Sequence, residues 1–303
     1  MDRYENQSPI GYKIGLLLIL SAGICWSFMG LGIRFMESAN VWQILFYRSC
    51  ALAVFLFIII SFRSKNRPMT AIRDAGITAV VGGTGLVFAF SGGIFAIQST
   101  SVANAMFLFA AAPFIAAFLA WIFLNEVVER RTWVTMAFAL LGISIMVSEG
   151  ISAGRLAGNL AAIVSAIGFA VFTVALRWGN INDMMPTVLI AGIFSIITSS
   201  LVCAFKGYSL NLPSNDLIIS LVLGFFQVGL GLSLYTLGSK SVPAVQATLL
   251  SMTEVILGPV WVWLFLNEIP LFYTILGGAI LLLALASNAV LSWNNNQGST
   301  LKI

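Results

Sequence analysis

The sequence predicts an all-α integral membrane protein whose ten transmembrane helices form two inverted five-helix repeats around a central cavity. The 303 residues are 59% hydrophobic and only 9% charged, with a mean hydropathy of +1.00. Soluble domains carry roughly 25% charged residues, so this composition indicates a membrane protein. Long uncharged stretches predict the helices, and sequence similarity between the two halves predicts the repeats.

The spans follow from the spacing of charged residues, because a bilayer core about 30 Å thick needs roughly 20 apolar residues per helix. Residues 13–34, 155–177, 183–206, 216–240 and 268–302 each hold one span, and residues 74–126 hold two, broken near 96–101. Three more are expected at 41–62, 132–147 and 242–266, which gives ten. The segments are continuously apolar and lack the alternation of transmembrane β-strands, which argues against a barrel.

Composition also excludes several function classes. The chain has no histidine, which removes serine and cysteine triads that use histidine, as well as zinc motifs of the H-E-x-x-H type. Cys25, Cys50 and Cys203 stand singly in apolar segments and are interpreted as packing residues. We therefore expect no cofactor and no metal. The net charge of +4 is spread over loops, so a nucleic-acid partner is not expected.

The distribution of lysine and arginine predicts the orientation. With an even number of spans both termini lie on one side, and cytoplasmic loops are richer in positive charge. A cytoplasmic N-terminus places Arg34, Arg155 and Lys206 outside and eleven cations inside: Arg3, Lys13, Arg63, Lys65, Arg67, Arg73, Arg130, Arg131, Arg177, Lys240 and Lys302. We therefore expect both termini in the cytoplasm.

The two halves of the chain are similar in register. Residues 95–126 parallel residues 235–268, so that the "LNE" ending at Glu126 returns at Glu268, 142 positions later. Likewise Arg34 matches Arg177, 143 positions later. We expect a first repeat at 1–150 and a second at 151–303. Five spans per repeat is an odd number, so the second copy is inverted, an arrangement that favours alternating access around a central site.

These motifs resemble a known family. "AAAPFIAAFLAWIFLNE" in the fourth span and "GPVWVWLFLNE" in the ninth, within a ten-span plan, are similar to the EamA branch of the drug/metabolite transporter superfamily. The resemblance implies a secondary transporter of small metabolites in the bacterial cytoplasmic membrane. It also implies a cavity lined by spans one, three, four, six, eight and nine. Pro113 of the fourth span has Val255 in register in the ninth, so an equal bend in both is not expected.

Glu254 is the first candidate site residue, since it lies in the middle of an apolar span. An ionised carboxylate at the bilayer centre costs roughly 2.5 to 3.5 kcal/mol unless it is solvated or paired. We expect it to face a cavity and to bind a substrate amine or a proton. At helical spacing its face also carries Ala247, Ser251, Gly258 and Trp261. The alternative is a protonated side chain that bonds a neighbouring helix.

Further candidates for substrate binding are polar or aromatic side chains within spans. Arg48 could bind a substrate carboxylate or pair with Glu254, or instead snorkel outward or tie two helices together. Gln227 and Tyr235 suit either a cavity or interhelical hydrogen bonds. Trp26 and Phe169 occupy matching positions and could sandwich a solute, although packing is the commoner role. The remaining candidates are Asn104 for the cavity, and Glu126 and Glu268 as gates or interface anchors.

Together these features predict a non-enzymatic carrier that moves a small polar or amphipathic metabolite, with amino-acid-like solutes first, and with a proton as one option for the coupling ion. The expected partners are this small molecule and the lipid bilayer, and the chain is expected to be a monomer or a homodimer. Two alternatives stay open: an intramembrane enzyme acting on lipid, and a facilitative channel. The eleven acidic residues are scattered along the chain, which argues against the enzyme.

Overall fold

The computed structural model describes residues 11–63, 68–152, 154–179, 181 and 183–300, and these fold into helices. In the first repeat the helices are α1 (Tyr12–Arg34), α2 (Val41–Arg63), α3 (Pro68–Asp74), α4 (Gly76–Ser99), α5 (Val102–Phe109), α6 (Ala112–Leu124) and α7 (Arg130–Ser152). In the second they are α8 (Leu156–Trp178), α9 (Met185–Lys206), α10 (Ser214–Val222), the π-helix η1 (Leu223–Leu230), α11 (Gly231–Gly238), α12 (Ala244–Ser251), α13 (Thr253–Leu266) and α14 (Phe272–Thr300).

Among the described residues, ten spans are long and apolar enough to cross a membrane, as the sequence predicts. Seven are single helices, whereas the fourth is α5 plus α6, the eighth is α10, η1 and α11, and the ninth is α12 plus α13. The predicted all-α, ten-span fold class is therefore confirmed. Arg3, Lys65, Arg67 and Lys302, four cations on which the predicted orientation depends, lie outside the described residues.

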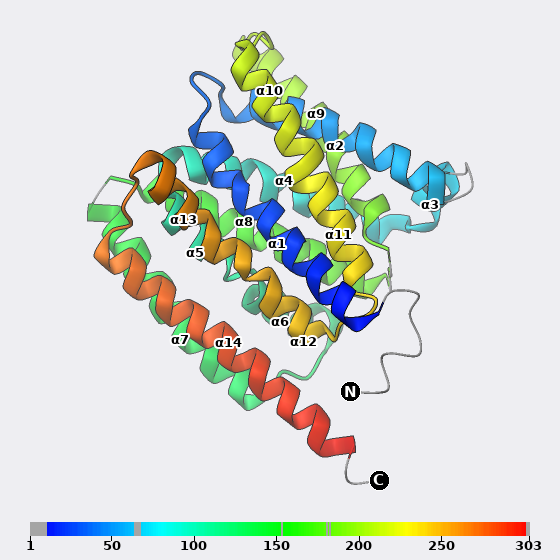
Figure 1. Ribbon diagram of the computed structural model, residues 1–303, viewed down its shortest axis with the longest axis vertical. Helices are drawn as coiled ribbons and strands as arrows, with labels where there is room; N and C mark the ends of the chain where they lie inside the picture. The colour runs from blue at the N-terminus through cyan, green and yellow to red at the C-terminus, as the bar shows by residue number, and fades with distance from the viewer. Residues whose placement is uncertain (1–10, 64–67, 153, 180, 182, 301–303) are drawn as a thin grey trace.

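The two repeats interlock by exchanging their first helices. Helix α1 packs against η1, α11 and α13 of the second repeat, and α8 packs against α4, α5 and α6 of the first. Helices α2 and α9 pack against each other, as do α7 and α14, which run side by side along one edge of the bundle (Figure 1). The helices that pack against α8 are thus equivalents of the spans that pack against α1. Inverted repeats produce this pattern.

Glycine allows the closest of these crossings. A Cβ on Gly168 of α8 would lie 2.5 Å from the carbonyl oxygen of Gly85 in α4. Gly142 of α7 and Gly277 of α14 approach each other in the same way, with 2.5 Å from each added Cβ to the opposite carbonyl oxygen. Small residues permit such contact in membranes, where van der Waals packing replaces the hydrophobic effect between helices. These glycines therefore allow close packing of α4 with α8 and of α7 with α14.

The two "LNE" motifs terminate equivalent helices. Asn125 after α6 and Asn267 after α13 adopt left-handed conformations, with φ of 53° and 54°. The next backbone N–H then bonds back six residues, from Glu126 to Ala120 and from Glu268 to Val262. This is the closure that a left-handed C-terminal residue provides. It aims the two glutamates at opposite faces of the bundle.

Asp216 in the first turn of α10 is a buried carboxylate that the sequence interpretation treats only as the edge of a span. Its side chain is fully buried and accepts backbone N–H groups of Glu37, Ser38 and Ala39 at 2.9–3.0 Å. It therefore fixes the connection between α1 and α2 to the eighth span. A carboxylate with three N–H donors is well satisfied, so its role is structural.

Candidate functional site

A cavity of about 260 Å³ lies between the repeats at the centre of the spans. Spans one, three, four, six, eight and nine supply most of its lining, with Arg48 of α2, Val188 of α9 and Leu285 of α14 added from three others. The six spans that the family resemblance implies are therefore the main contributors. Such a site at the repeat interface, near the middle of the helices, is typical of secondary transporters.

Both helices that flank the cavity break beside it. The fourth span is interrupted at Ala110 and Ala111, and the ninth at Met252, 142 positions after Ala110. Pro113 is compatible with the first break, because proline lacks an N–H and clashes with the preceding turn. The ninth span has no proline in register, yet it breaks at the equivalent place. The two spans therefore break at equivalent positions although only the fourth has a proline beside the break, and the expectation that they bend unequally stays a prediction.

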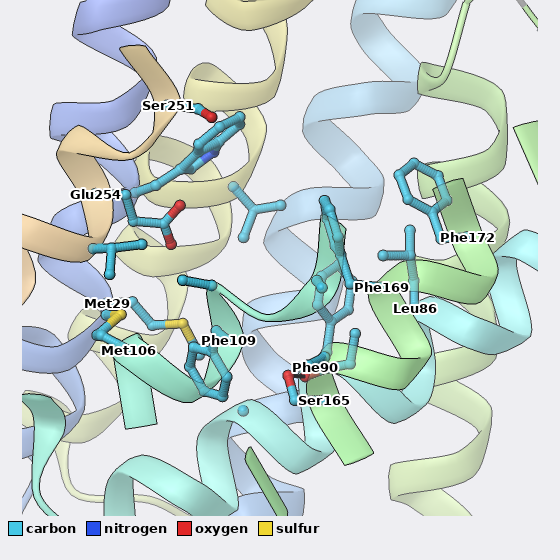
Figure 2. A pocket seen from close by; sticks show the side chains of 18 of the residues that line it. Met29, Leu86, Phe90, Met106, Phe109, Ser165, Phe169, Phe172, Ser251 and Glu254 are labelled. Carbon is cyan, nitrogen blue, oxygen red and sulfur yellow. Dashed lines mark hydrogen bonds between the residues drawn. The ribbon is translucent and has the colours of Figure 1, made fainter. Parts of the chain in front are cut away.

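Glu254 lies in the first turn of α13, directly after the break. Its carboxylate points into the cavity, with Ser251 on one side and Met29 and Met106 on the other (Figure 2). Among the described residues, no hydrogen bond or ion pair reaches this carboxylate. The break thus places Glu254 at the N-terminal end of α13, beside the cavity.

Arg48 faces the same cavity from α2 and is only 3% exposed. The backbone of η1 packs so tightly against α2 that a Cβ on Gly224 would lie 2.1 Å from the Arg48 carbonyl oxygen. The guanidinium carbon lies 4.9 Å from the centre of the Phe90 ring, and the buried Nη1 has no hydrogen-bond partner among the described residues. Arg48 and Glu254 interact electrostatically, but they are not among the salt bridges of the described chain.

Gln227 also lines the cavity and is buried, with 6% exposure. It lies within η1, and π-helical segments frequently mark functional sites. Its amide oxygen has no partner in the described part of the chain. Buried polar atoms are usually paired, so this oxygen is available to a ligand or to water. Tyr235 lies outside the lining and packs against Trp26, with 5.4 Å between ring centroids.

The aromatic candidates face the cavity in register. Trp26 of α1 and Phe169 of α8 both line it, and so do Met29 and Phe172 one turn further along the same helices. Phe169 is 48% exposed, although it lies midway along its span. The cavity therefore has an apolar side, formed by aromatic and methionine side chains, that is not fully covered by the rest of the protein.

Asn104 is placed elsewhere. It is buried but absent from the cavity lining, and its amide nitrogen donates to Thr100 and to Asn159 of α8. Of the stripe expected around Glu254, only Ser251 lines the cavity, while Gly258 packs on Met106 and Trp261 donates to Ser27. The stripe assumes one continuous helix, and the break at Met252 rotates its two ends relative to each other.

Several lining residues are missing from the sequence-based candidates, among them Met106, Phe109 and Thr248. The repeat offset could have found Phe109, because it is the equivalent of the candidate Ser251 at 142 positions. Met106 and Thr248 are equivalents of each other at the same offset, and neither was a candidate. Because a pseudo-twofold axis passes through the cavity, a lining residue in one repeat predicts one in the other.

The comparison with family models decides the class of protein, because the model described as the EamA-like transporter family matches twice, at residues 13–148 and 156–289. The chain belongs to the EamA-like transporter family. A solved structure titled only "Crystal structure of protein" is similar to this EamA chain, with 16% identity, a TM-score of 0.64, and coverage of 93% of this chain and 98% of that one. At this identity the likeness shows the fold alone. None of the curated proteins matches closely enough to suggest a substrate.

Membership in the EamA family assigns this ten-span membrane protein to the transporters of the drug/metabolite superfamily. The similarity noted in the two "LNE" segments is thus confirmed. The family does not select a solute, so the substrate has to be inferred from the chemistry of the cavity.

Proposed function

We propose that this EamA-family chain carries a small zwitterion with an apolar side chain across the membrane by alternating access. The observation that carries the proposal is a cavity into which one carboxylate, Glu254, and one guanidinium, Arg48, project without pairing with each other. A substrate with an ammonium group and a carboxylate would supply both missing partners. Amino-acid-like molecules have this charge pattern.

The energetics favour such a substrate. An uncompensated charge in a buried site costs several kcal/mol, and a partner with good geometry offsets much of that cost. The Nη1 atom of Arg48 would bind the substrate carboxylate, and Glu254 would bind the ammonium group. Gln227 would add an acceptor through its free amide oxygen. Each of these groups gains an interaction only when the ligand is present, which supports specific binding.

The rest of the cavity suits an apolar side chain. Phe169, Phe172 and Leu86 gather on one side, and Met29, Met106 and Phe109 lie below Glu254 (Figure 2). Burial of a hydrocarbon or aromatic group contributes roughly 25 cal/mol per Å² of apolar surface removed from water. The proposed substrate is therefore amphipathic, and a purely polar zwitterion would bind more weakly.

The architecture supports alternating access. Two interlocked repeats with similar backbones have two nearly equivalent packings, each of which opens the cavity to one face. The breaks between α5 and α6 and between α12 and α13 let each half of a span move separately.

Glu254 can also serve as the coupling group. Its carboxyl group can hold either a proton or the substrate ammonium, so exchange of one for the other would link solute movement to proton movement. By the same proposal the protein lies in a bacterial cytoplasmic membrane with both termini inside, which the excess of cations on that side supports.

Counterflow in proteoliposomes tests this function. We expect Glu254→Gln to lower counterflow of an amphipathic amino acid about 100-fold and to remove its pH dependence, because the amide can neither bind the ammonium ion nor exchange a proton. Glu149→Gln is the matched control, since Glu149 bonds Thr274 and does not line the cavity. Unchanged transport with an unchanged pH profile in the Glu254 variant would remove this residue from the mechanism. Flux without counterflow or saturation would indicate a channel.

A further inference from the structure

Two arginine–glutamate ion pairs occupy equivalent positions at opposite faces of the bundle. We call the face where α1 begins, at Tyr12, the terminal face, and the face where α1 ends, at Arg34, the distal face. Arg34 bonds Glu268 at the distal face, with 2.9 Å from Nε to Oε2. Arg177 bonds Glu126 at the terminal face. Each pair joins the first helix of one repeat to the end of the fourth helix of the other.

The distal pair also holds the start of α5. The second carboxylate oxygen of Glu268 accepts the backbone N–H of Val102 at 2.7 Å, and Arg34 Nη2 donates to the Thr100 carbonyl at 2.7 Å. First-turn N–H groups have no partner within their helix, and a carboxylate is favourable there. The distal pair therefore fastens α1, α13 and the turn between α4 and α5 into one unit.

The helices beneath the distal pair are packed together as well. Helix α5 packs against α13, where the Met106 side chain lies so close to Gly258 that an added Cβ would be 3.2 Å from it. The equivalent helices at the terminal face, α12 and α6, are not among the closely packed pairs of the described chain. The distal halves of the fourth and ninth spans therefore pack together more closely than their terminal halves, which is the arrangement expected when the distal face is closed.

The ion pair at the distal face is also less exposed than the one at the terminal face. The side chains of Arg34 and Glu268 are 27% and 23% exposed, whereas those of Arg177 and Glu126 are 50% and 37% exposed. A pair that closes a face is expected to be the better buried of the two. The pair at the terminal face is formed but lies more in solvent.

We propose that Glu268 and Glu126 are positioning residues of the transport cycle, which hold α5 and α12 in turn. In this structure Glu268 holds α5. In the state that opens the distal face, Glu126 accepts the N–H of Ala244, which is 142 positions after Val102, and Arg177 donates to the Val242 carbonyl, the equivalent of Thr100. The proposal rests on the alternating access proposed above. It adds the side chains that hold each face closed.

Matched pairs of spin labels can test the proposal in the full chain reconstituted in liposomes. Leu156→Cys with Ile269→Cys reports on the distal face, and the equivalent Lys13→Cys with Val127→Cys reports on the terminal face, with Cys25, Cys50 and Cys203 replaced by alanine. All four label positions are exposed. Thermal unfolding in detergent checks that each variant is folded before distances are measured.

We expect Glu268→Gln to raise the population with a long distal distance about tenfold, because it weakens the charge-assisted hydrogen bond to the Val102 N–H, which by the proposal exists only in the state with the distal face closed. Glu126→Gln is expected to lower that same population about tenfold. Opposite shifts from two chemically identical substitutions would support the proposal. A shift in the same direction, or none in either variant, would overturn it.

A charge exchange separates the backbone contacts from the ion pair. In Arg34→Glu/Glu268→Arg the pair can form, but the carboxylate now at position 34 cannot donate to the Thr100 carbonyl, and the guanidinium now at position 268 cannot accept the N–H of Val102. We expect this variant to behave like Glu268→Gln, and recovery of the wild-type distances would overturn the positioning role. Failure of the underlying function gives a different result, since the wild-type protein would then show one fixed distance at both faces with any substrate or pH.

Discussion

The two walls of the cavity, α5–α6 and α12–α13, use the same positions for opposite chemistry. The first wall contributes Met106, Phe109, Ala110, Ala112 and Pro113, and the second contributes Thr248, Ser251, Met252, Glu254 and Val255, each 142 positions later. Backbone symmetry is thus preserved while the side chains have diverged. The first wall is apolar, and the second carries two hydroxyl groups and a carboxylate.

This difference distinguishes two requirements: the backbone symmetry that exchange between two states requires, and the side chains that substrate binding requires. Exchange between two states requires two repeats whose backbones can replace each other. Binding of one molecule with one ammonium group requires a single acid, because a second carboxylate at position 112 would be left without a partner and would cost several kcal/mol. Under the proposed function, the position of Glu254 on one wall only would orient the substrate in the cavity.

Loss of Arg48 is expected to have the largest effect on this arrangement. We expect Arg48→Met to lower counterflow of a zwitterionic substrate by about 100-fold, since truncating one partner of a buried charged hydrogen bond costs roughly 2 to 5 kcal/mol. The thermal stability of the empty protein should stay equal or rise, because Arg48 has a buried Nη1 without a partner among the described residues. Arg155→Met is the control, as this arginine is exposed and does not line the cavity.

The result separates a substrate contact from a structural one. If Arg48→Met unfolds at a markedly lower temperature but retains transport, the arginine ties helices together, which is the alternative that the sequence leaves open. An amine without a carboxylate provides a second measurement. Its transport should be affected less than that of the zwitterion.

A smaller effect is expected where the two walls differ in size. Phe109→Ser makes the first wall match Ser251 of the second and removes apolar surface from the cavity. We expect transport of a substrate with an aromatic side chain to fall about tenfold, measured as kcat/KM, with little change for a small zwitterion, because burial of a large apolar side chain contributes roughly 1.5 to 3 kcal/mol. Equal losses for both substrates would show that Phe109 acts through packing instead of selectivity.

The architecture was predictable because its signals are long and repeated. Ten apolar segments of about 20 residues are hard to mistake, and the offsets from Arg34 to Arg177 and from Glu126 to Glu268, 143 and 142 positions, are nearly constant. The same offsets anticipate contacts that the structure shows. Each arginine pairs with the glutamate of the other repeat, as interlocked repeats require.

The direction of individual side chains was less predictable. Asn104 and its equivalent Gln246 both bond the first helix of the other repeat, Asn104 through Asn159 and Gln246 through Tyr12. A polar residue inside a span satisfies either a ligand or a neighbouring helix, and sequence spacing cannot distinguish the two. The break at Met252 was also not predictable from the sequence. It has no local sequence signal, so the face of the ninth span that meets the cavity depends on packing.

Pro113 offers the finest test of the comparison, because the ninth span breaks at the equivalent position with Val255 in its place. If packing at the cavity sets both breaks, Pro113→Val should leave the interruption at Ala110 and Ala111 in place and change transport by no more than about threefold. Restoring one backbone N–H would contribute roughly 0.5 to 1.5 kcal/mol if it found a partner. A crystal structure of the variant and its counterflow rate provide the measurement. A continuous helix from Val102 to Leu124 with transport lost would show that the proline creates the break, and that the two repeats reach the same shape by different means.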